Sequence, residues 1–100
     1  MIAYQNGNVK ANLTAYVDNW PGGDGYLYIG GSSFGAGNVS LNMNDGSGSP
    51  FATFVAVAST TTNITTAGLI KFSAPAGATM QLVVAGSTNP SLAISVFIAP

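Results

Sequence analysis

Apolar and polar residues alternate along most of this chain, as they do in β-strands that bury one face. The clearest stretch is residues 37–57, in which every second residue over 39–43 is apolar before a loop at 45–50. That loop consists of Asp, Gly, Ser and Pro, which favour tight turns. Apolar groups then occupy both faces of residues 51–57. The stretch predicts an antiparallel hairpin near the middle of a sheet, where both faces are covered.

Shorter runs of the same pattern predict the remaining strands. Residues 8–17 place apolar side chains at every odd position and predict one continuous, half-buried strand. Residues 1–7 carry a weaker signal, which we interpret as an N-terminal arm or a short edge strand. Further strands are predicted over residues 26–29, 69–73, 80–85 and 91–98. We expect the last two to form a closing hairpin, with residues 91–98 completing the sheet.

Turn-forming residues separate these strands. Residues 18–25 are dense in Gly, Pro and Asp and include Trp20, which is interpreted either as a lid on the open end of a sandwich or as a binding platform. The glycines of residues 30–37 match neither nucleotide-binding fingerprint, and no helical pattern follows, so they predict a bend or bulge. Residues 59–66 are polar and β-prone and predict a long connection or an exposed edge.

The number and spacing of these elements indicate the fold class. Seven or eight short strands, with turn signals about every ten residues and no convincing helix, are typical of all-β folds. We therefore predict a single antiparallel β-sandwich or jelly roll over residues 1–100. Periodicity does not reveal strand order, so the sandwich and the jelly roll remain alternatives.

Ionisable side chains are scarce in this chain. Only 5% of its residues are charged, against a usual ~25%, and the net charge is −1. A monomer of this kind has little electrostatic repulsion to keep it apart from its neighbours. We therefore expect copies of the chain, or a partner, to cover much of its surface. The alternative is a monomer that its many Asn, Ser, Thr and Gln residues keep soluble.

The same scarcity argues against an enzyme, a cofactor and a bound metal. General acid–base catalysis relies mostly on His, and the chain contains no His and no Cys. Asp18 and Asp24 could approach each other across their loop, but aspartates are common in turns. Zinc lacks its usual ligands. Asp45 is the single carboxylate in its Gly/Ser loop, whereas calcium requires several oxygen ligands.

Binding to nucleic acids and to membranes is not expected either. Phosphate neutralisation depends on Lys and Arg, and this chain has two lysines and a negative net charge. No apolar stretch approaches the ~20 residues of a membrane-spanning helix. The first ten residues lack the basic start and apolar centre of a signal peptide, so no secretion signal is expected.

Three stretches resemble a group of small β-rich virion proteins of tailed bacteriophages. They are GSSFGAGNVSLNMNDGSGSPF at 31–51, TTAGLIKFSAPAGATMQLVVAGS at 65–87 and PSLAISVFI at 90–98. The shared order is a Gly-rich bend, an alternating strand, an Asp-Gly loop with an aromatic residue, a strand, a Pro-Ala-Gly turn and a closing hairpin. This resemblance implies a structural protein on the capsid surface, a decoration or cement protein that docks as a homotrimer on the major capsid protein.

Two sets of residues are candidates for binding. Phe97 lies on the less apolar face of the final strand and is a candidate contact with another subunit. The alternative function is a carbohydrate-binding or host-adsorption module. In that case Trp20, Tyr26 and Tyr28 would form an aromatic platform for sugar rings. Asp18, Asn19 and Asp24 would then supply hydrogen bonds.

Overall fold

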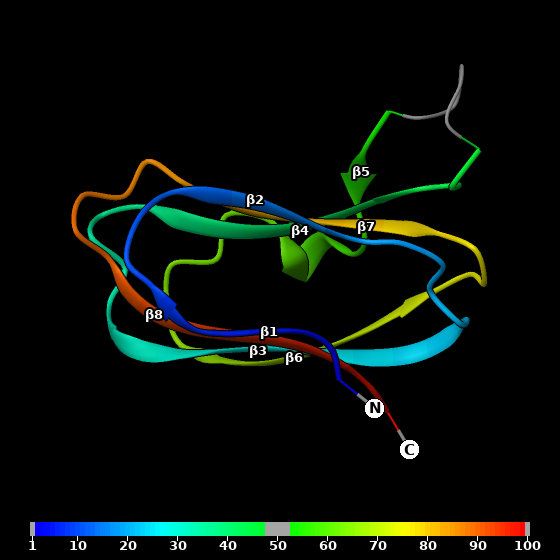
Figure 1. The fold of residues 1–100 in the computed structure, drawn as a ribbon, viewed down its shortest axis with the longest axis horizontal. Helices are drawn as coiled ribbons and strands as arrows, with labels where there is room; N and C mark the ends of the chain where they lie inside the picture. Colours follow the sequence, from blue (N-terminus) through cyan, green and yellow to red (C-terminus); the bar gives the residue numbers. More distant parts are fainter. Residues whose placement is uncertain (1, 48–52, 100) are drawn as a thin grey trace.

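Eight antiparallel strands in two facing sheets make up the fold (Figure 1). The structure is a computed structural model and describes residues 2–47 and 53–99. The strands are β1 (Ile2–Val9), β2 (Leu13–Val17), β3 (Gly23–Ser33), β4 (Asn38–Asn44), β5 (Val55–Ala56), β6 (Gly68–Ala74), β7 (Thr79–Ala85) and β8 (Ser91–Ile98). A short 3₁₀ helix, η1 (Ser59–Thr61), is the one helical segment of the described residues. The prediction of an all-β fold is confirmed.

The strand order is that of a jelly roll. One sheet, sheet A, has the order β1-β8-β3-β6, and the other, sheet B, has the order β2-β7-β4-β5. Strand β1 pairs with β8, β2 with β7, β3 with β6 and β4 with β5, all antiparallel. These nested pairs arise when one long hairpin is rolled into two sheets, which is jelly-roll connectivity. The predicted antiparallel sandwich is therefore present. Its strand order, which the sequence did not reveal, is that of a jelly roll.

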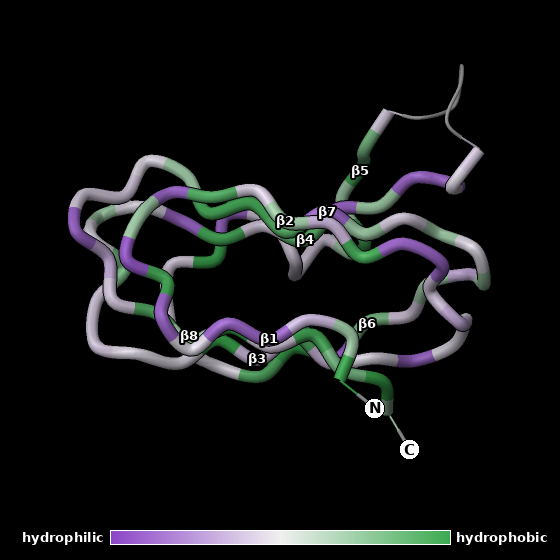
Figure 2. Tube along the Cα trace, in the orientation of Figure 1, coloured by the Kyte–Doolittle hydropathy of each residue, from purple (hydrophilic) through white to green (hydrophobic). Residues whose placement is uncertain are grey.

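The hydrophobic core lies between the two sheets, and the inner strands β3, β4, β7 and β8 contribute alternate residues to it. In β7, Met80, Leu82 and Val84 are buried while the residues between them are partly exposed. The other core strands follow the same rule, and Figure 2 shows hydrophobic segments in both layers. The largest fully buried side chains include Trp20, Leu27, Ile29, Leu41, Met80 and Ile94. Burial of alternate side chains explains why the period-two pattern located most strands.

The prediction of one continuous strand over residues 8–17 is wrong. The chain leaves sheet A after Val9 and enters sheet B at Leu13. Asn12 holds this crossing in place: its side-chain oxygen accepts a hydrogen bond from the Ser87 backbone N–H (2.9 Å). Because Val9 and Leu13 both contact the core, from opposite sheets, the alternation continues across the break. Residues 2–9 form an edge strand, which was one of the two expectations for residues 1–7.

The predicted central hairpin is correct for its first strand only. Strand β4 lies inside sheet B, between β7 and β5, with Val39 and Leu41 buried. Strand β5 is two residues long and lies at the sheet edge, where Val55 is 59% exposed. The expected position near the middle of a sheet is therefore wrong for the second strand. The first residues of that strand, 51 and 52, lie outside the described residues.

The expected closing hairpin of residues 80–85 and 91–98 is also wrong. Strand β7 lies in sheet B between β2 and β4, whereas β8 lies in sheet A between β1 and β3. The loop between them therefore crosses from one sheet to the other. Both strands bury one face in the same core, so their sequence patterns are those expected of a hairpin.

Strand β3 is longer than predicted, and it contains a bulge, which is one of the two predictions made for the glycines of residues 30–37. It begins at Gly23 and runs to Ser33, with a register shift against β8 between Gly31 and Ser33. Gly31 has a φ of 118°, and a Cβ atom there would collide with the Ser91 carbonyl oxygen. The glycine therefore permits both the backbone conformation and the close approach of β8.

Residues 59–66 form a long connection, which is one of the two alternatives that the sequence predicts, and Thr61 anchors it. Thr61 is completely buried, and its hydroxyl oxygen lies 3.0 Å from the Leu41 carbonyl oxygen and 2.8 Å from that of Ala58. It also accepts a hydrogen bond from the Ala58 backbone N–H (3.0 Å). Farther along the connection, Ile64 and Val39 form an antiparallel β-bridge, in which the backbone N–H of each donates a hydrogen bond to the carbonyl oxygen of the other (2.9 Å each).

Replacing Thr61 by Val is expected to destabilise the fold by about 1–3 kcal/mol, because the shape is retained while buried backbone groups lose their partner. Urea unfolding followed by circular dichroism measures the change. The matched control is Thr62→Val at the exposed neighbouring position, where we expect a change within about 0.5 kcal/mol. Equal effects at the two positions would contradict the assigned role of the Thr61 hydroxyl.

Candidate functional site

Trp20 belongs to the core and does not contribute to a binding surface. Its side chain is 1% exposed and packs against Phe72, with ring centroids 5.3 Å apart at an angle of 42°. Its backbone is held on both sides, by hydrogen bonds from Trp20 N–H to Ala78 O (3.0 Å) and from Gly77 N–H to Trp20 O (2.7 Å). The interpretation of Trp20 as a platform is therefore wrong. Its burial agrees with the alternative, a lid over the core.

Tyr26, Tyr28 and Phe97 share the outer face of sheet A. The register places Ile2 opposite Phe97, Phe97 opposite Tyr26, and Tyr28 opposite Leu69. Tyr26 and Phe97 stack at 5.5 Å with an angle of 30° between their rings. Ile2, Tyr28 and Leu69 are 55%, 45% and 57% exposed. We call these five residues the sheet A patch, and it extends over all four strands of that sheet.

Few charges accompany this patch. Lys71 lies opposite Tyr26 in the register and forms an ion pair with Asp24 (Nζ to Oδ2, 3.4 Å). Both side chains are about half exposed, so solvent screens the pair and its contribution to stability is small. The ion pair therefore leaves the margin of the patch without net charge.

The aspartates do not assemble into an acidic site. Asp24 pairs with Lys71, while Asp18 accepts a hydrogen bond from the Thr79 hydroxyl (3.4 Å). Hydrogen bonds from the Ser47 hydroxyl and the Ser47 backbone hold the pKa of Asp45 below its usual value. Within residues 2–47 and 53–99, no group of three or more His, Cys, Asp or Glu side chains could hold a metal ion.

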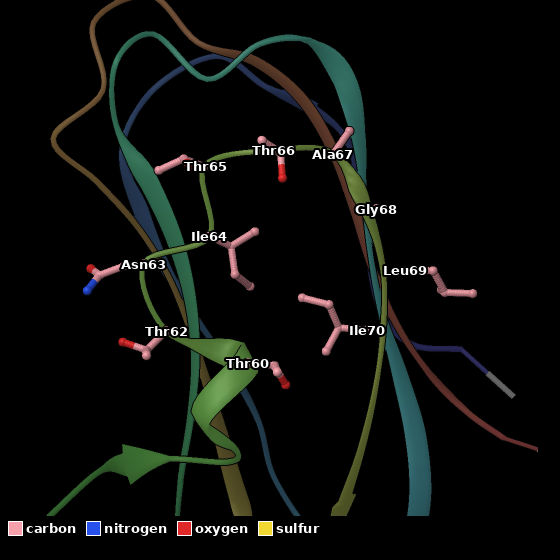
Figure 3. Close-up of a pocket in the computed structure, with 10 residues that line it drawn as sticks. All are labelled: Thr60, Thr62, Asn63, Ile64, Thr65, Thr66, Ala67, Gly68, Leu69 and Ile70. Carbon is pink, nitrogen blue, oxygen red and sulfur yellow. The ribbon is translucent and has the colours of Figure 1, made fainter.

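A cleft of about 330 Å³ lies between the connection of residues 60–67 and the edge strand β6 (Figure 3). Ile64 and Ile70 face each other across it, and Thr60 and Thr66 point into the space between the connection and β6, while Leu69 points away. Its lining comprises Thr60 and residues 62–70 and contains no ionisable side chain. The cleft therefore offers apolar contacts and hydroxyl hydrogen bonds to an uncharged group, and it offers no carboxylate or imidazole for acid–base chemistry.

The outer face of sheet B carries a surface that the sequence did not reveal. Tyr16 is 56% exposed and lies in the register row of Gln81 and Asn42. Phe54, from the segment before β5, reaches over this face, and its ring centroid lies 5.8 Å from that of Tyr16. The alternation in residues 8–17 places Tyr16 on the polar face of its strand, but nothing in the sequence pairs it with Phe54.

No family model matches the chain, and the comparison with curated proteins found no match. Within the described ranges, no helix has the length and apolar character needed to cross a membrane.

Proposed function

We propose that this chain is a structural protein of a tailed-bacteriophage particle, where it decorates or cements the capsid as a homotrimer on the major capsid protein. The observation that carries the proposal is the sheet A patch, which combines three aromatic rings with two aliphatic side chains on an exposed face. Contiguous apolar surface of this kind marks sites of contact with other proteins. The chain's resemblance to small phage virion proteins supplies the kind of partner.

The composition supports contact through this face rather than exposure to water. With 5% charged residues, the chain has little repulsion between molecules, and the Lys71–Asp24 ion pair beside the patch carries no net charge. Tyr and Phe are enriched in protein interfaces because each ring contributes a large contact area. Contact with two identical neighbours through closed three-fold symmetry would cover the patch and leave no open-ended assembly.

The jelly roll suits this role mechanically. Each sheet is tied to the other by loops that cross between them, at residues 10–12 and 86–90, so the two layers form one unit. Strands β8 and β3, which carry Phe97, Tyr26 and Tyr28, are the two inner strands of sheet A. The three aromatic residues of the patch therefore stand on strands that have hydrogen-bonded neighbours on both sides.

Light scattering coupled to size-exclusion chromatography tests self-association. We expect a mass three times the 10.0 kDa of the chain, and we expect Leu69→Asp to shift the protein to the monomer because a buried unpaired carboxylate is costly. The matched control is Val55→Asp, since Val55 is 59% and Leu69 57% exposed and both lie on edge strands. Two outcomes would contradict the sheet A patch as the interface between subunits: an oligomer that Leu69→Asp leaves intact, or a chain that stays a monomer at high concentration.

Electron microscopy of purified particles tests the location. Density for the chain on the capsid shell, with sheet A facing protein, is the expected result. Density in the tail, or absence from the particle, would contradict the capsid role even if the trimer were present in solution.

A further inference from the structure

The outer face of sheet B contains a row of one aromatic and two amide side chains that runs across three adjacent strands. The register places Tyr16 beside Gln81 and Gln81 beside Asn42, on three adjacent strands. The Asn42 amide nitrogen donates a hydrogen bond to the Gln81 side-chain oxygen (3.2 Å). This bond fixes two carboxamide groups next to an exposed aromatic ring. A row held in this way loses little side-chain entropy on binding a ligand.

The two amides keep free hydrogen-bonding capacity of both kinds. Each carboxamide has one acceptor oxygen and two N–H donors. The mutual bond uses one donor of Asn42 and one acceptor lone pair of Gln81. Within the described part of the chain, the Asn42 oxygen and the Gln81 amino group therefore remain available. Thr14 and Ser40 add hydroxyl groups in the next row, on either side of Val83.

Two aromatic rings border these amides. Tyr16 is 56% exposed, and the Phe54 ring is tilted by 46° to it at a centroid distance of 5.8 Å. The rings are therefore not stacked face to face, and the exposed tyrosine can receive a flat ligand. An aromatic face accepts the C–H side of such a ligand, while the neighbouring amides accept its polar edge.

We propose that this face of sheet B binds an uncharged saccharide. A sugar ring has an apolar C–H face for Tyr16 and hydroxyl groups that both donate and accept hydrogen bonds, as the free groups of Asn42 and Gln81 do. The rows of Tyr16 and Thr14 contain no charged side chain, so nothing in them would neutralise a phosphate, sulfate or sialic acid. The ligand class is therefore a neutral hexose or N-acetylhexosamine oligosaccharide.

This site is independent of the proposed contact between subunits through the sheet A patch. The sheet A patch and the Tyr16 row lie on the outer faces of opposite sheets, so subunits that associate through sheet A would leave the outer face of sheet B exposed to the solvent. The proposal also differs from the platform of Trp20, Tyr26 and Tyr28 that the sequence suggested, because Trp20 is buried. The two proposals can therefore fail separately. If the chain binds no saccharide, the expected oligomeric state is unaffected, and if the chain is a monomer, the expected saccharide binding is unaffected.

A glycan array that carries neutral and acidic oligosaccharides, probed with the full chain, tests the proposal. We expect binding to neutral glucose-, galactose-, mannose- or N-acetylglucosamine-containing chains and none that depends on an acidic sugar. Titration of the isotope-labelled protein with a bound oligosaccharide, followed by NMR, should shift the amide signals of residues 14–16, 40–42 and 81–83. Shifts confined to other residues would overturn the assigned position.

Substitutions separate stacking from hydrogen bonding. Tyr16→Ala should weaken binding about tenfold or more, the loss expected when a stacking ring is removed. Tyr16→Phe keeps the ring and should bind nearly as well, while Gln81→Ala should weaken binding with the fold intact by circular dichroism. An array without neutral-glycan binding, or binding that Tyr16→Ala leaves unchanged, would overturn the proposal. A change of oligomeric mass in Tyr16→Ala without glycan binding would identify this face as a protein contact instead.

Discussion

A chain that ends at Pro90 is expected not to fold. This truncation removes β8, which pairs with both β1 and β3 at the centre of sheet A. Leu92, Ile94 and Val96 would leave the core with it, each at most 2% exposed in the complete chain. Their burial contributes about 1.5–3 kcal/mol per side chain. A domain of this size has a net stability of only about 5–15 kcal/mol, so the loss of three such side chains and two strand pairings exceeds what it can tolerate.

Circular dichroism and amide hydrogen exchange measure this outcome. We expect the truncated chain to lose its strand signal and to exchange all amides rapidly. A pair of point variants separates burial from chain length: Ile94→Asp should unfold the protein, because Ile94 is 1% exposed, whereas Ser95→Asp on the opposite face of β8 should leave it folded. A folded truncated chain would contradict the inner position of β8.

The faces of the strands could be predicted from the sequence alone. The inner and outer sides of β3, β4, β7 and β8 follow the alternation of apolar residues: in β3, Leu27 and Ile29 are buried on one face while Tyr26 and Tyr28 lie on the other. Alternation is readable because a strand's side chains point to opposite faces, so the pattern depends only on which face meets the core.

The partner of each strand could not be predicted, because both sheets bury their inner faces in the same core. Val9 and Leu13 belong to different sheets, yet both face the core, so the alternation passes through the crossing without a break. Strands β7 and β8 likewise resemble a hairpin although their loop changes sheets. Short loops favour hairpins as a rule, and the jelly roll departs from that rule at each crossing between sheets.

The same distinction applies to the aromatic residues of the surfaces and the core: the positions of some could be predicted from the sequence, and those of others could not. Tyr26, Tyr28 and Phe97 lie on an outer face, as the alternation in their strands indicates. Trp20 and Phe54 lie in irregular segments, where no periodicity predicts a side chain's direction. Their contacts, to Phe72 and to Tyr16, join segments far apart in the chain and depend on how the sheets are assembled. Surfaces built from such contacts become visible only in the folded structure.

Replacing Trp20 by Ala is expected to destabilise the protein by about 3–5 kcal/mol, the cost of removing a fully buried aromatic side chain and leaving a cavity. The site cannot close easily, because the backbone of Trp20 is hydrogen-bonded to Gly77 and Ala78. On its other side, a Cβ atom added at Gly25 would lie only 2.7 Å from the indole ring. The ring therefore fills a space that the surrounding backbone defines.

Urea unfolding measures the effect, and circular dichroism must replace fluorescence as the probe because Trp20 is the single Trp of the chain. Trp20→Phe should restore part of the stability by refilling some of the cavity against Phe72. The control is Tyr16→Ala, which removes an exposed ring and should change stability far less. If Trp20→Ala cost no more than Tyr16→Ala, the indole would have to lie at the surface, and the aromatic platform that burial excludes would again be possible.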